Sequence, residues 1–251
     1  MGQDISRHNE EIRINQGRWD SKSLLRRVYR EFHKEIAARL SRVGAGPVVE
    51  IGSGIGAIRE TIPDCVRTDL FRNPWIDRLE SAYRLSFSDA SVSDFILIDV
   101  FHHLRHPGLA FREIQRALRP GGRVILLEPD TGLLGIAVFT LLHHEPLCLW
   151  RAIEWEAPPG FSPEKDEYYA AQGNAHRIFF ARRFRPMLEG FRLLERRRMS
   201  ALPWLASGGY SPLGIRSVRV HSALSAIGRA LDLLPWLFST RLLAVLEKPL
   251  E

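Results

Sequence analysis

The sequence predicts an α/β protein with a doubly wound, mostly parallel sheet. Three apolar runs support this fold class: VVEI at 48–51, SDFILIDV at 93–100 and RVILLEP at 123–129. Nearly continuous apolar strands are typical of sheets that are covered on both faces. The runs alternate with turns and helical patterns, which implies parallel strands joined by right-handed crossovers. Ligands in such sheets bind beyond the carboxyl ends of the strands.

The other elements follow in chain order. Apolar residues at three- and four-residue spacing predict a helix over 20–42. The segment PVVEIGSGIGAIRE at 47–60 predicts a strand, a glycine-rich turn and a second helix, and a short strand over 65–68 ends at Asp69. An amphipathic helix begins at Pro107 and is stopped by Pro120, and GLLGIAVFTLL at 132–142 predicts a buried helix. Two late strands, FRLLERRRMS and RLLAVLEKP, contribute to an expected total of seven.

These elements divide the chain into four parts. We expect an N-terminal helical cover over 1–46, and a core over 47–200 whose segment 131–190 lines the acceptor pocket. An amphipathic lid insert follows over 201–240, and the closing strand of the core lies in 241–251. Arginines between the regularly spaced apolar residues of 212–238 also suit a helix lying on an anionic membrane. A lid packed on its own domain or on a second copy is the alternative.

Composition excludes several classes of protein. The 251 residues carry a net charge of +6, but the charge comes from arginines spread along the chain and no nucleic-acid-binding motif accompanies them, so a nucleic-acid partner is not expected. Two cysteines provide neither a disulfide framework nor metal-ligand spacing. No secretory signal is visible. We expect a cytoplasmic protein, with 212–238 as a candidate contact to the inner face of the membrane.

The glycine-rich turn fits two cofactor patterns. Gly52 to Ala57 matches the dinucleotide fingerprint G-x-G-x-x-A, and the same stretch counted from Glu50 reads E-x-G-x-G-x-G. Glycines let the backbone approach a cofactor where a Cβ would collide. A short-chain dehydrogenase would also need a Tyr-x-x-x-Lys pair, and neither Tyr168 nor Tyr169 has a lysine four residues later.

Four motifs in the same order resemble the class I S-adenosylmethionine (SAM) dependent methyltransferases, particularly the type 11 domain. They are the glycine turn, Asp69 after the second strand, YRLSFSDASVSDFILIDVFHHL at 83–104 and EIQRALRPGGRVILLEP at 113–129. The resemblance implies a seven-strand fold and SAM as cofactor. Two positions depart from the family pattern, with Ser81 before Ala82 and Ser93 where acids are usual. The residues expected to line the cofactor are Glu50, Gly52, Ser53, Gly54, Gly56, Asp69, Leu70, Ser81, Ala82, Asp99 and Val100.

Histidines are the candidates for acid–base chemistry at the acceptor, since an oxygen acceptor usually needs a base. His103 is the first choice, followed by His102 and His144. Glu145 is placed near the pocket by its position after the fifth strand, and Asn174, His176 and Arg177 only by a looser resemblance. Adjacent histidines on a helix point about 100° apart, so His143 and His144 do not predict a shared metal site. We expect no metal.

The sequence therefore predicts a SAM-dependent methyltransferase. Its acceptor would be a small molecule, a sugar or a lipid-linked compound of bacterial polysaccharide or specialised-metabolite biosynthesis. Two alternatives remain at this level: an NAD(P)-dependent sugar-modifying enzyme, and a non-catalytic, membrane-associated protein with the same fold. The sequence does not indicate the oligomeric state.

Overall fold

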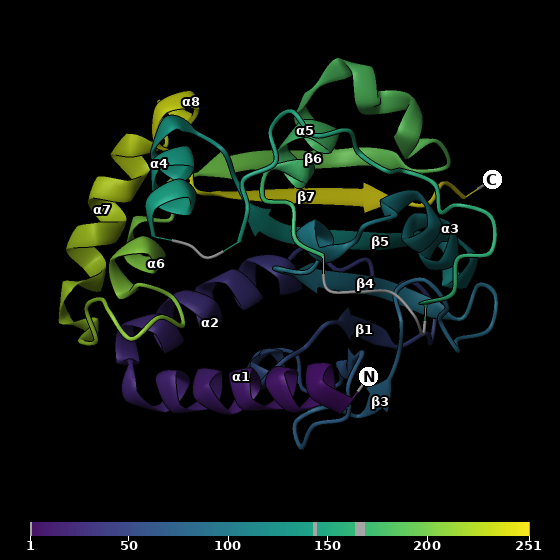
Figure 1. Ribbon diagram of the computed structural model, residues 1–251, viewed down its shortest axis with the longest axis horizontal. Helices are drawn as coiled ribbons and strands as arrows, with labels where there is room; N and C mark the ends of the chain where they lie inside the picture. The colour runs from purple at the N-terminus through teal and green to yellow at the C-terminus, as the bar shows by residue number, and fades with distance from the viewer. Residues whose placement is uncertain (1, 143–144, 164–168, 251) are drawn as a thin grey trace.

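A computed structural model describes residues 2–142, 145–163 and 169–250 of the chain. Seven strands within these ranges form one sheet in the order β3-β2-β1-β4-β5-β7-β6 (Figure 1). The predicted seven-strand, doubly wound sheet is confirmed. The strands are β1 (Val48–Ile51), β2 (Val66–Asp69), β3 (Arg78–Leu79), β4 (Val92–Ile98), β5 (Leu118–Pro129), β6 (Arg192–Met199) and β7 (Arg241–Glu247).

Strands β1 to β5 pair in parallel, and β7 enters antiparallel between β5 and β6. Alternate residues of β5 serve different faces of the sheet. Val124 and Leu126 join the larger core, and Ile125 and Leu127 join a second core on the other side. This is why the strand reads as an unbroken apolar run.

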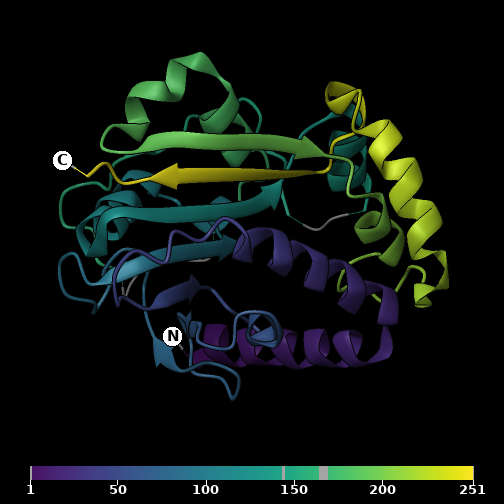
Figure 2. The ribbon, with the colours of Figure 1, turned by 180° about the vertical axis from the view of Figure 1, so that it is seen from behind.

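Helices cover both faces (Figure 2). The larger core is closed by α3 (Pro107–Ala117), α5 (Asn174–Phe180) and the 3-10 segment η4 (Arg182–Leu188). The second core is closed by α2 (Ser23–Ala37). The helix expected over 20–42 forms as α2, which begins at Ser23 and ends at Ala37, and a longer helix, α1 (Gly2–Ser21), precedes it.

The prediction of a helix after the glycine turn is wrong. Only the one-turn 3-10 segment η1 (Ala57–Glu60) forms there. Pro63 lies three residues beyond it and cannot continue a helix, and Cys65 already leads into β2. Ile12 of α1 packs in one cluster with Ile55 of the turn and Ala57 of η1, so α1 covers this part of the turn.

The helix at 132–142 forms as α4 (Leu133–Leu141), but it is not buried. Its two ends carry Leu133, Leu141 and Leu142, whose exposed fractions are 54%, 77% and 78%. It packs on the insert helix α8 (Pro235–Phe238), beside α6 (Leu202–Ser207), η5 (Val218–Val220) and α7 (His221–Leu231). These helices gather beyond the carboxyl end of β5 (Figure 1). Among the described residues, no helix combines the length and apolar composition that a membrane crossing requires.

Candidate active site

A cavity of about 440 Å³ lies beyond the carboxyl ends of β1, β2 and β4. This volume is within the range of small-molecule sites. All the sequence-predicted cofactor residues except Gly56 line it. The lining includes Glu50, Gly52, Ser53, Gly54, Asp69, Leu70, Ser81, Ala82, Asp99 and Val100.

The glycine turn after β1 needs its glycines for different reasons. Gly52, Gly54 and Gly56 all have φ between 52° and 71°, a left-handed conformation that disfavours other residues. A Cβ on Gly52 would lie 2.4 Å from Val100 Cγ2, and one on Gly56 would lie 2.6 Å from the Trp75 carbonyl oxygen. A Cβ on Gly54 would meet no protein atom within 4 Å. Gly54 therefore keeps open a space in the cavity wall, and Gly56 shapes the turn from behind.

Two carboxylates border this turn. Asp69 Oδ2 accepts a hydrogen bond from the Gly54 N–H at 3.0 Å, and its Oδ1 accepts one from the Leu70 N–H at 2.7 Å. Glu50 is 5% exposed, and its Oε2 is buried without a hydrogen-bond partner among the described residues. Burial is the main cause that raises the pKa of Glu50 to about 8, and the Asp69 charge adds to it.

Asp99 is bound within the protein. Its carboxylate pairs with the guanidinium of Arg241 from β7, with Arg241 Nη2 at 2.8 Å from Asp99 Oδ2, and Tyr29 of α2 approaches the same oxygen. Arg241 is 1% exposed. Asp99 therefore connects the cavity wall to α2 and β7 through these contacts. The local sequence did not reveal this role, because the two partners of Asp99 lie 70 and 142 positions away.

The two histidines after β4 take different positions. The 3-10 segment η2 (Phe101–His103) is held by Glu128 at the end of β5, whose carboxylate accepts the N–H groups of Val100 and Phe101 at 2.9 and 2.7 Å. Glu128 Oε2 also lies 2.7 Å from Nδ1 of His102, which is 3% exposed. His103 lines the cavity, and His102 lies behind it.

His103 donates from Nδ1 to the Tyr169 carbonyl oxygen at 2.9 Å, because a carbonyl can only accept. Burial and the neighbouring His102 lower the pKa of His103 to about 4. The ring is therefore neutral near pH 7, with the Nε2 lone pair on its cavity side. Glu145 also lines the cavity, with its Oε1 3.5 Å from His103 Nε2. His144 lies outside the described residues.

Asn174, His176 and Arg177 do not line the cavity. His176 Nδ1 lies 2.5 Å from Asp130 Oδ1, and Asp130 also accepts from Arg198 Nε at 2.6 Å. The Arg177 guanidinium donates to the carbonyls of Cys148 and Arg151. These side chains fix the segment around α5 against β5 and β6.

Sequence reasoning missed several cavity residues. Glu11, Ile12 and Asn15 of α1 and Tyr210 of the insert line the same cavity. Ile12 and Trp19 of α1 are both buried, and these apolar residues seven positions apart in an otherwise polar helix are the signal that could have indicated that α1 packs on the core. Tyr210 stands in a loop with no periodic pattern, so no local signal marks it.

Comparisons with known proteins agree with this geometry. Residues 49–126 match the family model described as a methyltransferase domain. A comparison with curated protein sequences finds no match. The structure of a geranyl diphosphate C-methyltransferase from Streptomyces coelicolor, solved with Mg²⁺, geranyl diphosphate and S-adenosyl-L-homocysteine, superposes with a TM-score of 0.53 at 10% identity, covering 87% of this chain and 77% of that one.

Two further structures show how widely this fold is shared. One is a chain of the complex between the Haloferax volcanii Trm112 methyltransferase activator and a methyltransferase candidate, with a TM-score of 0.52, 18% identity and coverage of 94% and 93%. The other is the [4+2]-cyclase SpnF, with a TM-score of 0.50, 14% identity and coverage of 88% and 81%. At these identities the likeness establishes the fold. Residues 49–126 therefore resemble a methyltransferase domain, and the chain has the fold of these solved structures.

Proposed function

We propose that this protein transfers the methyl group of SAM to an oxygen of a small-molecule or lipid-linked acceptor held beside His103. The observation that carries the proposal is the cavity itself. It joins the glycine turn, Glu50 and Asp69 at one end to His103 and Glu145 at the other. The fold alone does not decide the reaction, since one protein that shares it is a [4+2]-cyclase.

The residues present fit SAM. The open side of Gly54 leaves room for the backbone to approach the methionine part of the cofactor. The unpaired Oε2 of Glu50 would accept from the cofactor's ammonium group. The Asp69 carboxylate, which lines the cavity, would accept from the ribose hydroxyls. Ser81, Ala82 and Tyr83 would border the adenine, with the Ala82 N–H as the candidate donor.

When bound, SAM supplies an electrophilic methyl group on a sulfonium and leaves as S-adenosylhomocysteine. The chain must then orient the acceptor oxygen in line with the breaking carbon–sulfur bond and exclude water. The Nδ1–H of His103 is committed to the Tyr169 carbonyl, so Nε2 is the atom that would take the hydroxyl proton. Tyr210 and α1 would close the cavity over the reactants.

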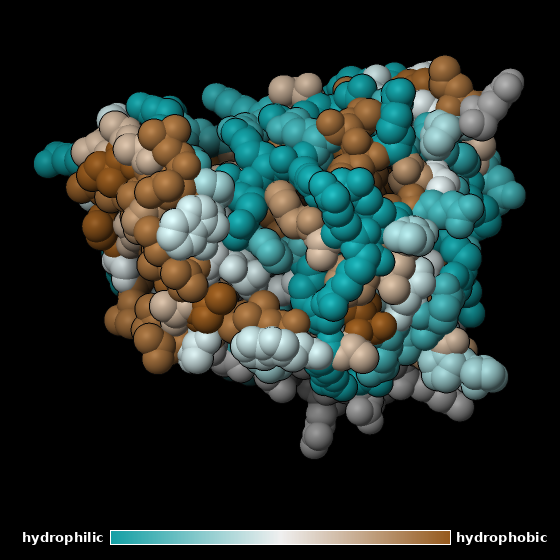
Figure 3. Space-filling model, turned by 90° about the horizontal axis from the view of Figure 1, so that it is seen from above, coloured by the Kyte–Doolittle hydropathy of each residue, from teal (hydrophilic) through white to brown (hydrophobic). Residues whose placement is uncertain are grey.

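The acceptor class is suggested by the surface beside the cavity. Exposed apolar side chains gather where α4, α7 and α8 meet, which is the left side of Figure 3. We call this surface the apolar face; it comprises the exposed apolar side chains at the end of α4, in the turn after α7 and on α8, which are Leu141, Leu142, Leu233, Leu234 and Trp236. Arg216, Arg219 and Arg229 of the same insert are exposed. Apolar and basic groups together suit an anionic bilayer and a lipid-linked acceptor.

Calorimetric titration tests the cofactor assignment. We expect S-adenosylhomocysteine to bind with micromolar affinity, and NADH and NADPH not to bind. Binding of a nicotinamide cofactor alone would establish the dehydrogenase alternative. If none of the three binds, the non-catalytic alternative becomes the better description.

An Asp69→Asn substitution locates that binding. The loss of a charged acceptor for two hydroxyls should weaken S-adenosylhomocysteine by about 10- to 100-fold. Asp77→Asn is the matched control, because Asp77 pairs with Arg67 and Arg59 and does not line the cavity. Equal affinities for the two variants would refute the ribose assignment.

A further inference from the structure

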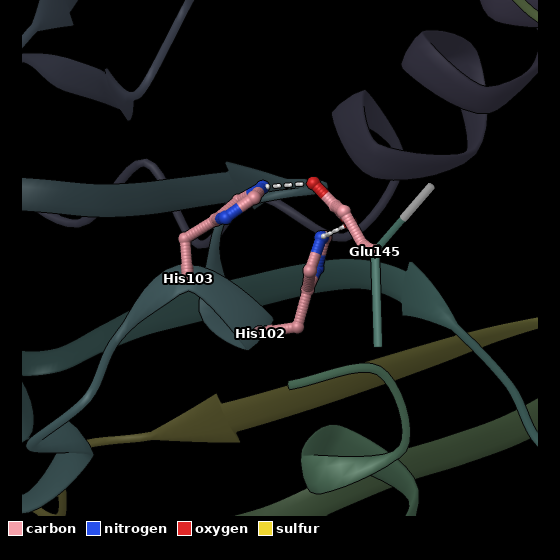
Figure 4. Close-up of side chains that lie close together, drawn as sticks. All are labelled: His102, His103 and Glu145. Carbon is pink, nitrogen blue, oxygen red and sulfur yellow. Dashed lines mark ion pairs between the residues drawn. The ribbon is translucent and has the colours of Figure 1, made fainter. Parts of the chain in front are cut away.

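Three side chains from two distant parts of the chain converge at the acceptor end of the cavity (Figure 4). His102 and His103 come from η2, and Glu145 comes from the segment after α4. His102 Nε2 lies 3.4 Å from Glu145 Oε2, and His103 Nε2 lies 3.5 Å from Glu145 Oε1. Each residue offers one possible ligand atom, a histidine nitrogen or a carboxylate oxygen, and these three atoms lie within 4.8 Å of one another.

These separations are close to those of a metal site. Nitrogen and carboxylate ligands lie about 2.0–2.2 Å from Zn²⁺, so two ligands of a tetrahedral ion are about 3.4 Å apart. Both histidine–carboxylate separations already have this length. The two separations end on different oxygens of Glu145, so rotation of that carboxylate would be needed to bring one oxygen and both nitrogens to a single ion. The imidazole rings are tilted by 40° to each other, with centroids 4.1 Å apart.

The outer contacts of the three residues orient them as metal ligands are oriented. Nδ1 of His102 faces the Glu128 carboxylate, and Nδ1 of His103 faces the Tyr169 carbonyl, so both rings direct Nε2 toward Glu145. Glu145 Oε2 accepts from Gln172 Nε2 at 2.5 Å. Histidine ligands almost always donate their second N–H to a carboxylate or carbonyl, and ligating carboxylates are hydrogen-bonded in turn.

Charge also favours a cation here. Glu128 is fully buried and Glu145 is 9% exposed, and both carboxylates contact the same His102 ring. Two buried negative charges are costly unless positive charge compensates them. A proton on His102 would supply one positive charge, whereas a divalent ion would supply two.

We propose that His102, His103 and Glu145 bind one divalent transition-metal ion of the Zn²⁺ or Fe²⁺ class. Two imidazoles with one carboxylate suit these ions better than Mg²⁺, which prefers oxygen ligands. Three protein ligands leave at least one coordination position, and it faces the cavity, because His103 and Glu145 line it. This departs from the sequence-based expectation of no metal.

The role of the ion rests on the proposed function, but its binding does not. An ion at this position would lower the pKa of an acceptor hydroxyl that contacts it. His103 Nε2 would then act as a ligand and the acceptor would not need it as a base. The hydroxyl proton would leave to solvent or buffer, and the acceptor oxygen would still form its bond to the methyl carbon as the carbon–sulfur bond breaks.

Co²⁺ titration of the untagged, full-length protein tests the site, by visible absorption and by calorimetry. We expect one equivalent to bind, with bands typical of nitrogen and oxygen ligation. His103→Ala and Glu145→Gln should each weaken binding at least 100-fold. Glu128→Gln, which alters the contact behind His102 and the carboxylate that holds η2, should weaken it about 10-fold. His176→Gln is the matched control, because His176 pairs with a buried carboxylate outside the cavity. It should bind as the wild type does.

Thermal unfolding and S-adenosylhomocysteine binding are measured on every variant. Loss of Co²⁺ binding in variants that still fold and bind S-adenosylhomocysteine supports the site. Wild-type affinity for Co²⁺ no higher than that of the His103→Ala/Glu145→Gln double variant overturns it. A wild type that binds Co²⁺ through these residues but not S-adenosylhomocysteine would leave the metal site standing and remove the proposed function.

Discussion

At the scale of one residue, the buried carboxyl group of Glu50 makes the free energy of unfolding depend on pH. The group is nearly neutral at pH 7 in the folded chain, because burial raises its pKa to about 8, whereas it ionises near its ordinary pKa when unfolded. The folded state therefore binds more protons than the unfolded state between these two values. The stabilising contribution of Glu50 is complete below about pH 4.5 and is lost as pH rises toward 8.

A Glu50→Gln substitution should separate stability from binding. We expect the free energy of unfolding at pH 7, without cofactor, to rise by about 1–3 kcal/mol, since the amide has no proton to gain. The affinity for S-adenosylhomocysteine should fall at least 10-fold, because the charged acceptor is lost. Urea denaturation at pH 5, 7 and 8.5, with calorimetry at pH 8, measures both. A variant less stable than the wild type at pH 8.5 would contradict this account.

At the scale of elements, one buried lysine ties the insert to the N-terminal helices. Lys22 stands between α1 and α2 and is fully buried. Its ammonium nitrogen lies 2.6–2.9 Å from the carbonyl oxygens of Ser207, Gly209, Ser211 and Leu213, which share its three N–H donors. Burial lowers the pKa of Lys22, and Arg18 and Arg216 lower it further. The loop that carries Tyr210 into the cavity is therefore shaped around a single cation.

Replacement of that cation should loosen the insert. Lys22→Met leaves four carbonyl oxygens without their donor, so we expect a loss of about 2–4 kcal/mol in the free energy of unfolding. Proteolysis within 207–217 should become faster before the core unfolds. Lys34→Met is the control, since Lys34 is exposed on α2. The role assigned to Lys22 fails if both variants have wild-type stability and proteolysis rates.

For the whole molecule, the apolar face and its arginines predict peripheral membrane binding. The full-length protein should float with vesicles that contain phosphatidylglycerol and remain unbound with neutral phosphatidylcholine vesicles. Leu233→Ser/Trp236→Ala should reduce the bound fraction through lost apolar contact. Arg216→Glu/Arg219→Glu should reduce it by at least 10-fold, at about 1 kcal/mol for each charge removed.

The control is Trp150→Ala, which removes another exposed tryptophan, 89% accessible, from the segment between α4 and α5, outside the insert. This variant should float as the wild type does. If neither vesicle type retains the protein, or if Trp150→Ala has the same effect as the insert variants, the apolar face is not a membrane contact.

The sequence by itself determined six of the seven strands, the glycine turn and the position of Asp69 at the end of β2, but it did not locate the two-residue strand β3. The strands follow from apolar residues that alternate or form an unbroken run, and the glycine turn follows from backbone φ values that favour glycine. Both are local properties of the chain. It also identified His102 and His103, because they directly follow a buried strand. The sequence-based prediction was wrong where local signals conflict. After the glycine turn, for example, a helical pattern is interrupted by Pro63, and the predicted helix does not form.

Only the tertiary structure decided which distant residues meet. It placed Glu145 against the two histidines, Arg241 against Asp99 and Lys22 inside the loop of the insert. It also exposed α4, whose apolar sequence suits a buried helix and a surface contact equally well. In each case the partner lies 40 or more positions away, and its position depends on sheet order and packing, which no local pattern carries.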